Sequence, residues 1–192
     1  MLEYEKKILL TKEEYEVLVQ QFKNIPKKIQ INYYFDTEDL SMNKRGVTCR
    51  TRFKNGKYKT TIKRHCSDRL NCSIEEELCE TTEINVDVFN ALDLCFQGEL
   101  VTSRICLYKD ASFEVVLDWN IYLGISDYEL EVEYDEENEK NAMDCLKDIV
   151  VHLIAAQLVD SFENFVLRVG KGKSKSERFF ERKQKKEERQ ES

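Results

Sequence analysis

Five segments of the chain alternate charged residues with apolar or neutral ones at every second position, which is the pattern of β-strands. In a strand, residues i, i+2 and i+4 lie on one face, so each segment has a charged face. The faces at 3–7 and 129–133 are mainly acidic, and those at 50–54, 59–63 and around Arg104 are basic. A sheet that brought these faces together would bind a metal ion and a polyanion at the same site.

Similar segments along the chain predict eight strands. They are expected near 1–10, 29–37, 47–54, 57–64, 73–80, 99–109, 112–121 and 125–134. Asn55-Gly56 lies between two alternating runs and predicts a two-residue hairpin turn between the third and fourth strands.

Four further segments have the features of helices. Thr11, followed three residues later by Glu14, predicts a capping box at the start of a helix over 12–23. Helices also fit 85–96, 138–159 (with a break) and 174–189. Residues 181–192 are so polar that we expect a frayed C-terminal tail after a single domain over 1–180.

The predicted fold class is α+β: a closed, eight-stranded antiparallel β-barrel, or tunnel, with a charged lumen and helices packed outside. The apolar partners of the charged residues are large, as in Phe113, Leu117 and Trp119, and amphipathic helices can bury them on the outside. The alternative is a sheet whose charged face meets solvent, which is common in antiparallel sheets and favoured for any one strand. A row of one sign, such as 129–133, argues for the lumen because like charges repel unless a cation lies between them.

Composition narrows the functional classes. The chain has 192 residues, 41% hydrophobic and 35% charged, and no apolar run near the ~20 residues of a membrane helix. We therefore expect a globular, cytoplasmic protein without a membrane partner. The net charge of −7 argues against a general nucleic-acid binder, although it is compatible with a focused positive pocket.

The seven cysteines do not predict a disulfide framework or a zinc site, because their number is odd and no C-x-x-C occurs. A catalytic cysteine would need a positioned base, and the chain offers only His65 and His152. His152 lies in an apolar run and is expected to be a core histidine.

The motifs, taken in order, resemble one family. Residues 3–7 fit the E-x-E-x-K signature of CYTH-domain proteins, also called triphosphate tunnel metalloenzymes, and the resemblance extends to about residue 180. The later segments that are similar to that family's motifs are 34–37, Arg50-x-Arg52, 61–63, 102–104, Asp118, 127–133 and 173–179.

Some positions depart from the family pattern. Cys49 stands where leucine is usual, and Thr102 stands where many members have a second basic residue. Residues 73–77 fit the acidic fifth strand only loosely, and it stays open whether Glu75 and Glu77, or Glu76 instead, face inward.

The resemblance implies a tunnel that binds a triphosphate and one or two divalent ions, Mg²⁺ or Mn²⁺. Carboxylates suit these hard cations, and arginine can grip phosphate oxygens in pairs. Glu131, Glu129 and Lys7 are the candidate catalytic residues. The candidate substrate-binding residues are Lys7, Arg50, Arg52, Lys63, Arg104 and Lys175. The candidate metal ligands are Glu3, Glu5 and Glu131, with Glu129, Glu133 or Asp118 nearby.

The function predicted is that of a metal-dependent triphosphatase acting on inorganic triphosphate, with a nucleoside or thiamine triphosphate as the next candidates. One alternative is a class IV-type adenylyl cyclase that makes cyclic AMP from ATP. Another is a non-catalytic module that binds triphosphate or polyphosphate. The expected partner is a small triphosphate, with no nucleic acid, and the expected state is a monomer or a homodimer.

Overall fold

The computed structural model describes residues 2–67, 72–81, 83, 87–169 and 173–189, without the side chains of 2–3, 65–80, 87–88 and 136. The strands are β1 (Leu2–Leu10), β2 (Lys28–Asp36), β3 (Val47–Lys54), β4 (Lys57–Ser67), β5 (Cys72–Thr81), β6 (Cys95–Lys109), β7 (Phe113–Tyr122) and β8 (Ile125–Tyr134). The helices are α1 (Lys12–Gln21), α2 (Ser41–Lys44), α3 (Asp87–Asn90), α4 (Glu139–Ala155), α5 (Phe162–Val166) and α6 (Lys175–Glu188), with a 3₁₀ turn at Glu136–Asn138.

Neighbouring strands pair antiparallel in the order β1-β5-β4-β3-β2-β6-β7-β8. β8 pairs with β1 from Tyr4–Tyr134 to Leu10–Tyr128, so the strand order returns to its start. The pairing between β1 and β5 is short and joins 2–4 with 72–74. The α+β class and the antiparallel sheet agree with the prediction.

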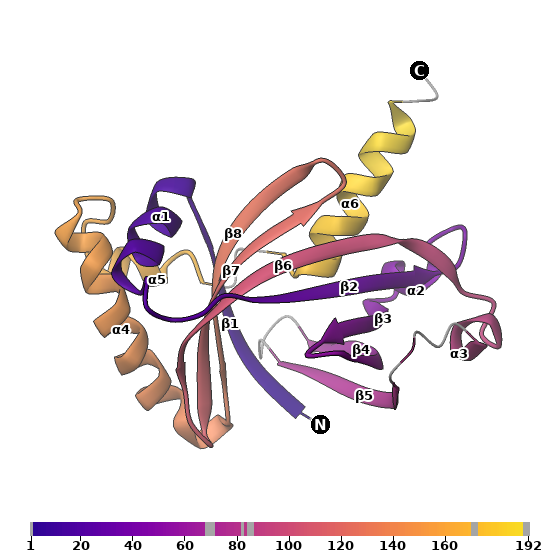
Figure 1. The fold of residues 1–192 in the computed structure, drawn as a ribbon, viewed down its shortest axis with the longest axis horizontal. Helices are drawn as coiled ribbons and strands as arrows, with labels where there is room; N and C mark the ends of the chain where they lie inside the picture. The colour runs from indigo at the N-terminus through magenta and orange to yellow at the C-terminus, as the bar shows by residue number, and fades with distance from the viewer. Residues whose placement is uncertain (1, 68–71, 82, 84–86, 170–172, 190–192) are drawn as a thin grey trace.

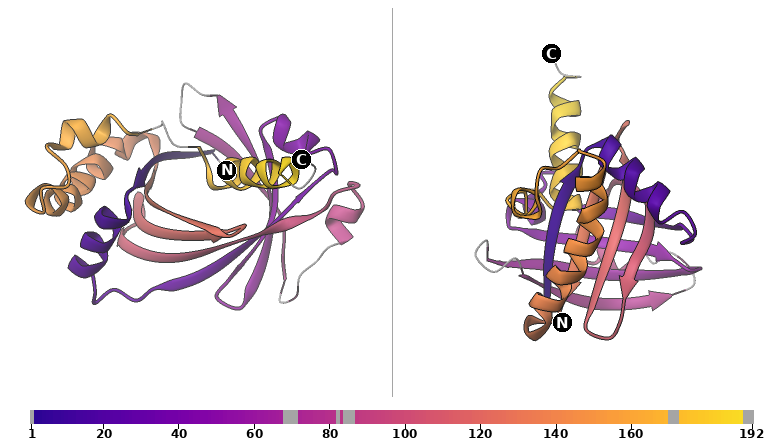
Figure 2. Two further views of the ribbon diagram at one scale, coloured as in Figure 1. Left: turned by 90° about the horizontal axis from the view of Figure 1, so that it is seen from above. Right: turned by 90° about the vertical axis from the view of Figure 1, so that its left-hand side faces the viewer.

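Helices α1, α4 and α5 cover one outer face of the sheet (Figures 1 and 2). Their apolar faces bury Ile8, Leu117 and Leu130, which come from β1, β7 and β8. Leu146 of α4 and Phe165 of α5 are fully buried in the same cluster. Burial of this face explains how the opposite face of the same strands can be charged.

Helix α6 differs from the expectation that all helices pack outside. Its Phe179 and Phe180 pack against Tyr34, Leu100 and Tyr122, which project from the same face of the sheet as the charged residues. The helix lies apart from α1, α4 and α5 (Figure 2). The sequence of α6 is polar apart from this aromatic pair, and the pair is what anchors the helix against the interior face. Residues 181–188, expected to fray, are helical.

The turns confirm the local predictions. Thr11 and Glu14 form the capping box of α1. Asn55 and Gly56 both have positive φ, 53° and 79°, and place Lys54 opposite Lys57.

The helix predicted over 85–96 is present, but it is much shorter than predicted. It is reduced to α3, and β6 begins at Cys95 instead of near 99. Phe89 of α3 is buried. It is buried by stacking on Phe35 of β2, with the ring centroids 4.1 Å apart. Helices α2 and α5 lie outside the predicted elements, since each has too few residues to show a periodic pattern. None of the described helices is both long and apolar enough to cross a membrane.

A substitution at Gly98 tests the packing of α6 against the sheet. Its φ is +140°, and a Cβ there would lie 2.8 Å from Cζ of Phe179. We expect Gly98→Ala to lower the free energy of unfolding by about 1–3 kcal/mol, because the ring must move and the backbone is strained. Gly124→Ala is the matched control, since its φ is +80° and nothing lies within 4 Å. Urea denaturation should give a smaller loss for the control, and equal losses would contradict this packing of α6.

Candidate functional site

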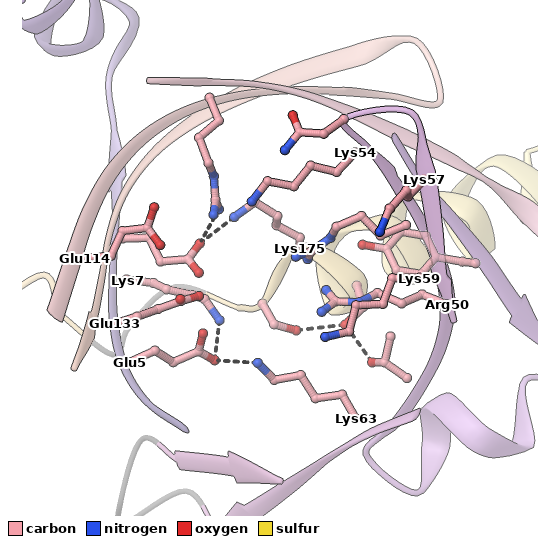
Figure 3. Close-up of a pocket in the computed structure, with 18 residues that line it drawn as sticks. Glu5, Lys7, Arg50, Lys54, Lys57, Lys59, Lys63, Glu114, Glu133 and Lys175 are labelled. Carbon is pink, nitrogen blue, oxygen red and sulfur yellow. Dashed lines mark hydrogen bonds and ion pairs between the residues drawn. The ribbon is translucent and has the colours of Figure 1, made fainter. Parts of the chain in front are cut away.

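The interior of the sheet contains a cavity of about 360 Å³ with charged walls (Figure 3). Acidic side chains of β1, β7 and β8 form one wall, where Glu5, Glu114 and Glu133 lie. Cations of β3 and β4 face them across the cavity. The six predicted substrate-binding residues all line this cavity: Lys7, Arg50, Arg52, Lys63, Arg104 and Lys175.

The predicted acidic residues form two groups that share Glu131. Glu5, Glu131 and Glu133 offer carboxylate oxygens within 4.8 Å of one another, and so do Asp118, Glu129 and Glu131. We call these the outer triad and the inner triad. The structure does not describe the side chains of Glu3, Glu75, Glu76 and Glu77. The role of Glu3 as a metal ligand therefore remains a prediction, and the direction of the other three stays open.

The inner triad is buried and already holds an ammonium group. Nζ of Lys175 bonds to Glu129, lies 2.6 Å from Oε2 of Glu131 and lies 3.0 Å from Oδ2 of Asp118. Arg104 grips Asp118 with two bonds, of 2.9 and 2.7 Å. At the inner triad, two of the predicted phosphate-binding residues, Arg104 and Lys175, are therefore bonded to predicted metal ligands.

Arg178 is a site residue to which sequence reasoning gave no role. Its NH2 group donates to Glu129 at 2.5 Å, and its Nε donates to Asp127 at 2.9 Å. Arg178 belongs to the motif at 173–179. The spacing of residues along a polar helix does not predict that its side chain points to β8. Four further residues line the cavity and were not among the candidate site residues. The alternation of charged and apolar positions was the sequence feature that could have indicated them: Lys54, Lys57, Lys59 and Glu114.

The outer triad contains two carboxyl groups with opposite pKa shifts. Burial raises the pKa of Glu5, but attraction to Lys7 (2.5 Å) and Lys63 (3.8 Å) outweighs it and lowers the pKa to about 2. Burial raises the pKa of Glu131 to about 7, opposed by Arg104 and Lys7 and supported by Glu133. Of these two carboxylates, Glu131 is therefore the one whose charge needs a further cation.

Asp118 behaves like Glu5. Burial raises its pKa, but Lys175 and Arg104 outweigh that effect and lower the pKa to about 2. Burial also holds the pKa of Lys175 well below its usual value, although Asp118 opposes this. The charged form of Lys175 therefore stabilises the charged form of Asp118, and Asp118 in turn stabilises the charged form of Lys175.

Two arginines of the basic wall each donate a hydrogen bond to a neutral side chain. Nε of Arg50 donates to Thr61 at 3.3 Å, and Nε of Arg52 donates to Asn32 at 2.8 Å. These bonds fix the plane of each guanidinium, which suits paired bonds to phosphate oxygens.

The chemistry of the acidic wall fits a divalent ion. Both triads consist of carboxylate oxygens, the ligands preferred by Mg²⁺ and Mn²⁺. Glu131 belongs to both, so a cation at either position would lie beside it. With the basic wall opposite, the cavity can hold a polyanion against a metal ion.

Lys175→Met tests whether the ammonium balances the inner triad. We expect the variant to lose about 3–5 kcal/mol of stability in EDTA, because buried carboxylates lose their partner. Mn²⁺ should then raise the melting temperature of the variant more than that of the wild type, since the ion replaces the missing charge. Thermal unfolding with EDTA or Mn²⁺ measures both effects.

Lys173→Met is the control for that experiment. Lys173 pairs with Glu181 at the surface, so its loss should change stability by less than about 1 kcal/mol. Equal destabilisation by the two variants, or no added effect of Mn²⁺ on Lys175→Met, would contradict the ion balance.

Many solved structures are similar to this fold, and two of them show how far the likeness extends. One is a proposed adenylate cyclase from Bacillus halodurans, 26% identical, with a TM-score of 0.64 over 93% of this chain and 97% of that chain. The other is HpAC1 from Hippeastrum, 18% identical, with a TM-score of 0.56 over 78% of this chain and 85% of that chain. The second likeness shows the fold alone.

Comparison of sequences gives the family. YjbK of Bacillus subtilis strain 168, a proposed triphosphatase, is 28% identical over 165 residues, which are 72% of this chain and 80% of that protein. The model of the CYTH domain matches residues 1–147, which include every strand of the sheet. The chain therefore belongs to the CYTH domain family.

Proposed function

We propose that this protein is a divalent-metal-dependent triphosphatase, with inorganic triphosphate as the main substrate and nucleoside or thiamine triphosphates as the next candidates. The observation that carries the proposal is the cavity in which the cations of β3 and β4 face the two carboxylate triads. A site that only bound an anion would not need so many acids beside it.

The proposal includes a tunnel over residues 1–180 as one domain. In such a tunnel the strands would enclose the cavity, α6 would cover one end, and the β3–β4 hairpin would lie at the rim. A substrate would enter beside the hairpin and stop at Lys175.

The basic residues would bind and orient the phosphate chain. Arg50 and Arg52 present guanidinium groups from β3, while Lys63 adds a point charge from β4. Arg104 and Lys7 lie next to the carboxylates, where they can stabilise negative charge on the transferred phosphoryl group. A bound Mg²⁺ or Mn²⁺ would withdraw charge from the phosphate oxygens and relieve repulsion within the triads.

Glu131 is the best candidate to position the attacking water. Its raised pKa, about 7, makes it a carboxyl group that can accept a proton near neutral pH. Glu129 would orient Lys175 and Arg178 rather than contact the substrate, because both of its oxygens are bonded to them.

The second candidate function is an adenylyl cyclase. It is favoured by the Bacillus halodurans structure, which is 26% identical to this chain over almost its whole length. The same clamp and ions would serve both reactions, so products decide between them: orthophosphate for hydrolysis and cyclic AMP for cyclisation.

We expect the purified protein to release orthophosphate from inorganic triphosphate in the presence of Mg²⁺ or Mn²⁺, and EDTA to stop the reaction. The reason is the repulsion among the carboxylates, which a divalent ion relieves. A phosphate assay with triphosphate and ATP, together with detection of cyclic AMP, measures the outcome. Equal rates with and without EDTA would contradict the metal, and cyclic AMP as the main product from ATP would favour the cyclase.

Substitutions should distinguish the role of the acidic wall in turnover from that of the basic wall in substrate binding. Glu131→Gln keeps the size of the side chain, so we expect kcat to fall about 100-fold or more while the fold is retained. Arg52→Ala should mainly raise KM, by about tenfold, since phosphate contacts act before and during the reaction.

Glu114→Gln is the control for the acidic wall. Glu114 lines the cavity but belongs to neither triad, and it pairs with Lys109 at 2.8 Å. Its kcat should stay within about threefold of the wild type. Retention of wild-type kcat by Glu131→Gln at saturating metal would mean that the glutamate row is structural.

A further inference from the structure

The outer face of the sheet carries a row of apolar side chains that crosses five neighbouring strands. The pairing of the strands places each residue of the row beside the next: Tyr58 of β4, Phe53 of β3, Ile31 of β2, Val101 of β6 and Ile121 of β7. Their sequence neighbours Arg52, Lys54 and Lys57 line the cavity, so the row lies on the opposite face. We call these five residues the outer row.

The outer row has no helix over it in the part of the chain that the structure describes. On one side of the row, α1, α4 and α5 cover β1, β7 and β8. On the other side, Phe89 of α3 stacks on Phe35 at the end of β2. None of the five residues belongs to either of these two clusters. In Figure 1 no helix lies in front of β2 and β6, and Figure 2 shows α6 on their other side.

Apolar surface on this face is exposed. Ile29, which shares the outer face of β2 with Ile31, is 56% exposed, and Ile121 at the end of the row is 41% exposed. Tyr33 is half-buried, and its ring centroid lies 6.3 Å from that of Tyr58. A sheet face that meets water usually carries polar residues at such positions, so this face indicates a contact surface.

The charges beside the row have opposite signs at its two edges. Lys27 is exposed just before β2, and Glu99 is exposed on β6 opposite Tyr33. Six residues separate Lys27 from Tyr33, which is about 20 Å of extended chain, so Lys27 and Glu99 of one molecule are too far apart to pair. A face with a cation at one edge and an acid at the other complements a copy of itself that is turned round.

We propose that the outer row is a homodimer interface, in which a second copy of this chain packs on the same face about a two-fold axis. The axis would cross β2 between Ile29 and Ile31, so that each Ile29 packs against the partner's Ile31. Each Lys27 would then lie over the partner's Glu99. The two sheets would pack face to face about 10 Å apart, as in a β-sandwich. Glu99 and the net charge of −7 disfavour an anionic membrane or nucleic acid on this face.

The size of the face sets the expected affinity. Five strands at a spacing of about 4.8 Å give a row about 19 Å long. A standard interface buries about 800 Å² on each partner, which corresponds to a face about 28 Å square. We therefore expect a weak dimer with a dissociation constant of about 10 µM. Sedimentation equilibrium measures this constant, and a wild type that stays monomeric up to about 200 µM would overturn the interface.

Ile29→Lys tests the apolar contact. Because Ile29 is exposed, we expect the variant to fold and to melt at nearly the same temperature as the wild type. Its dissociation constant should rise about tenfold or more, since two lysines in each dimer would be buried against apolar side chains.

Val151→Lys is the matched control for this variant. Val151 of α4 is 52% exposed, but it lies outside the row. Its substitution should leave the dissociation constant within about twofold of the wild type. Equal dissociation constants of Ile29→Lys and the wild type would contradict the interface.

Reversal of charge tests the two-fold arrangement. Lys27→Glu would place an acid over the partner's Glu99 twice in each dimer, so it should weaken the dimer about tenfold at low salt. Glu99→Lys should weaken it by a similar factor for the same reason.

The double variant Lys27→Glu/Glu99→Lys restores opposite signs across the axis. Its dissociation constant should return to within about threefold of the wild type. A further loss in the double variant would mean that these two residues do not meet, and the arrangement would be wrong. Lys27, Ile29 and Glu99 are not among the residues that line the cavity, so the outcome does not depend on the proposed function.

Discussion

The structure depends on the balance of buried charges between β7, β8 and α6. Asp118 and Glu129 are fully buried, and Glu131 is 4% exposed. Buried carboxylates are strongly destabilising without partners, and here Lys175, Arg104 and Arg178 provide them. Two of these cations belong to α6, so the charge balance and the position of the last helix cannot be separated.

This balance explains why the apolar residues face outward. With carboxylates and cations in the interior, Ile8, Leu117 and Leu130 must be covered from outside, and α1, α4 and α5 do so. The strand alternation therefore predicts both the outer helices and the charged cavity, because one cannot exist without the other. That is why the period of two in the sequence was sufficient to predict the class of fold and the opposite signs of the walls.

The contacts of α6 could not be predicted in the same way. Lys175 and Arg178 reach carboxylates 44 to 57 residues earlier in the chain, and no local pattern records such separations. The pair Phe179-Phe180 was the available signal for burial of a helix that is otherwise polar. For α3 the local pattern misled, since Phe89 is buried by stacking on Phe35 of a strand rather than by a helical apolar face.

The two ends of the cavity differ in the charges that folding brings together. At the end beside α6 each described carboxylate of the inner triad is bonded to a cation of the protein itself, so folding alone completes it. At the hairpin Lys54 faces Lys57 and Arg52 faces Lys59, so folding gathers cations from β3 and β4 on the wall of the cavity. A polyanion that enters at the rim would meet these cations first and the carboxylates last. The attraction is local, and it is therefore compatible with a chain whose net charge is −7.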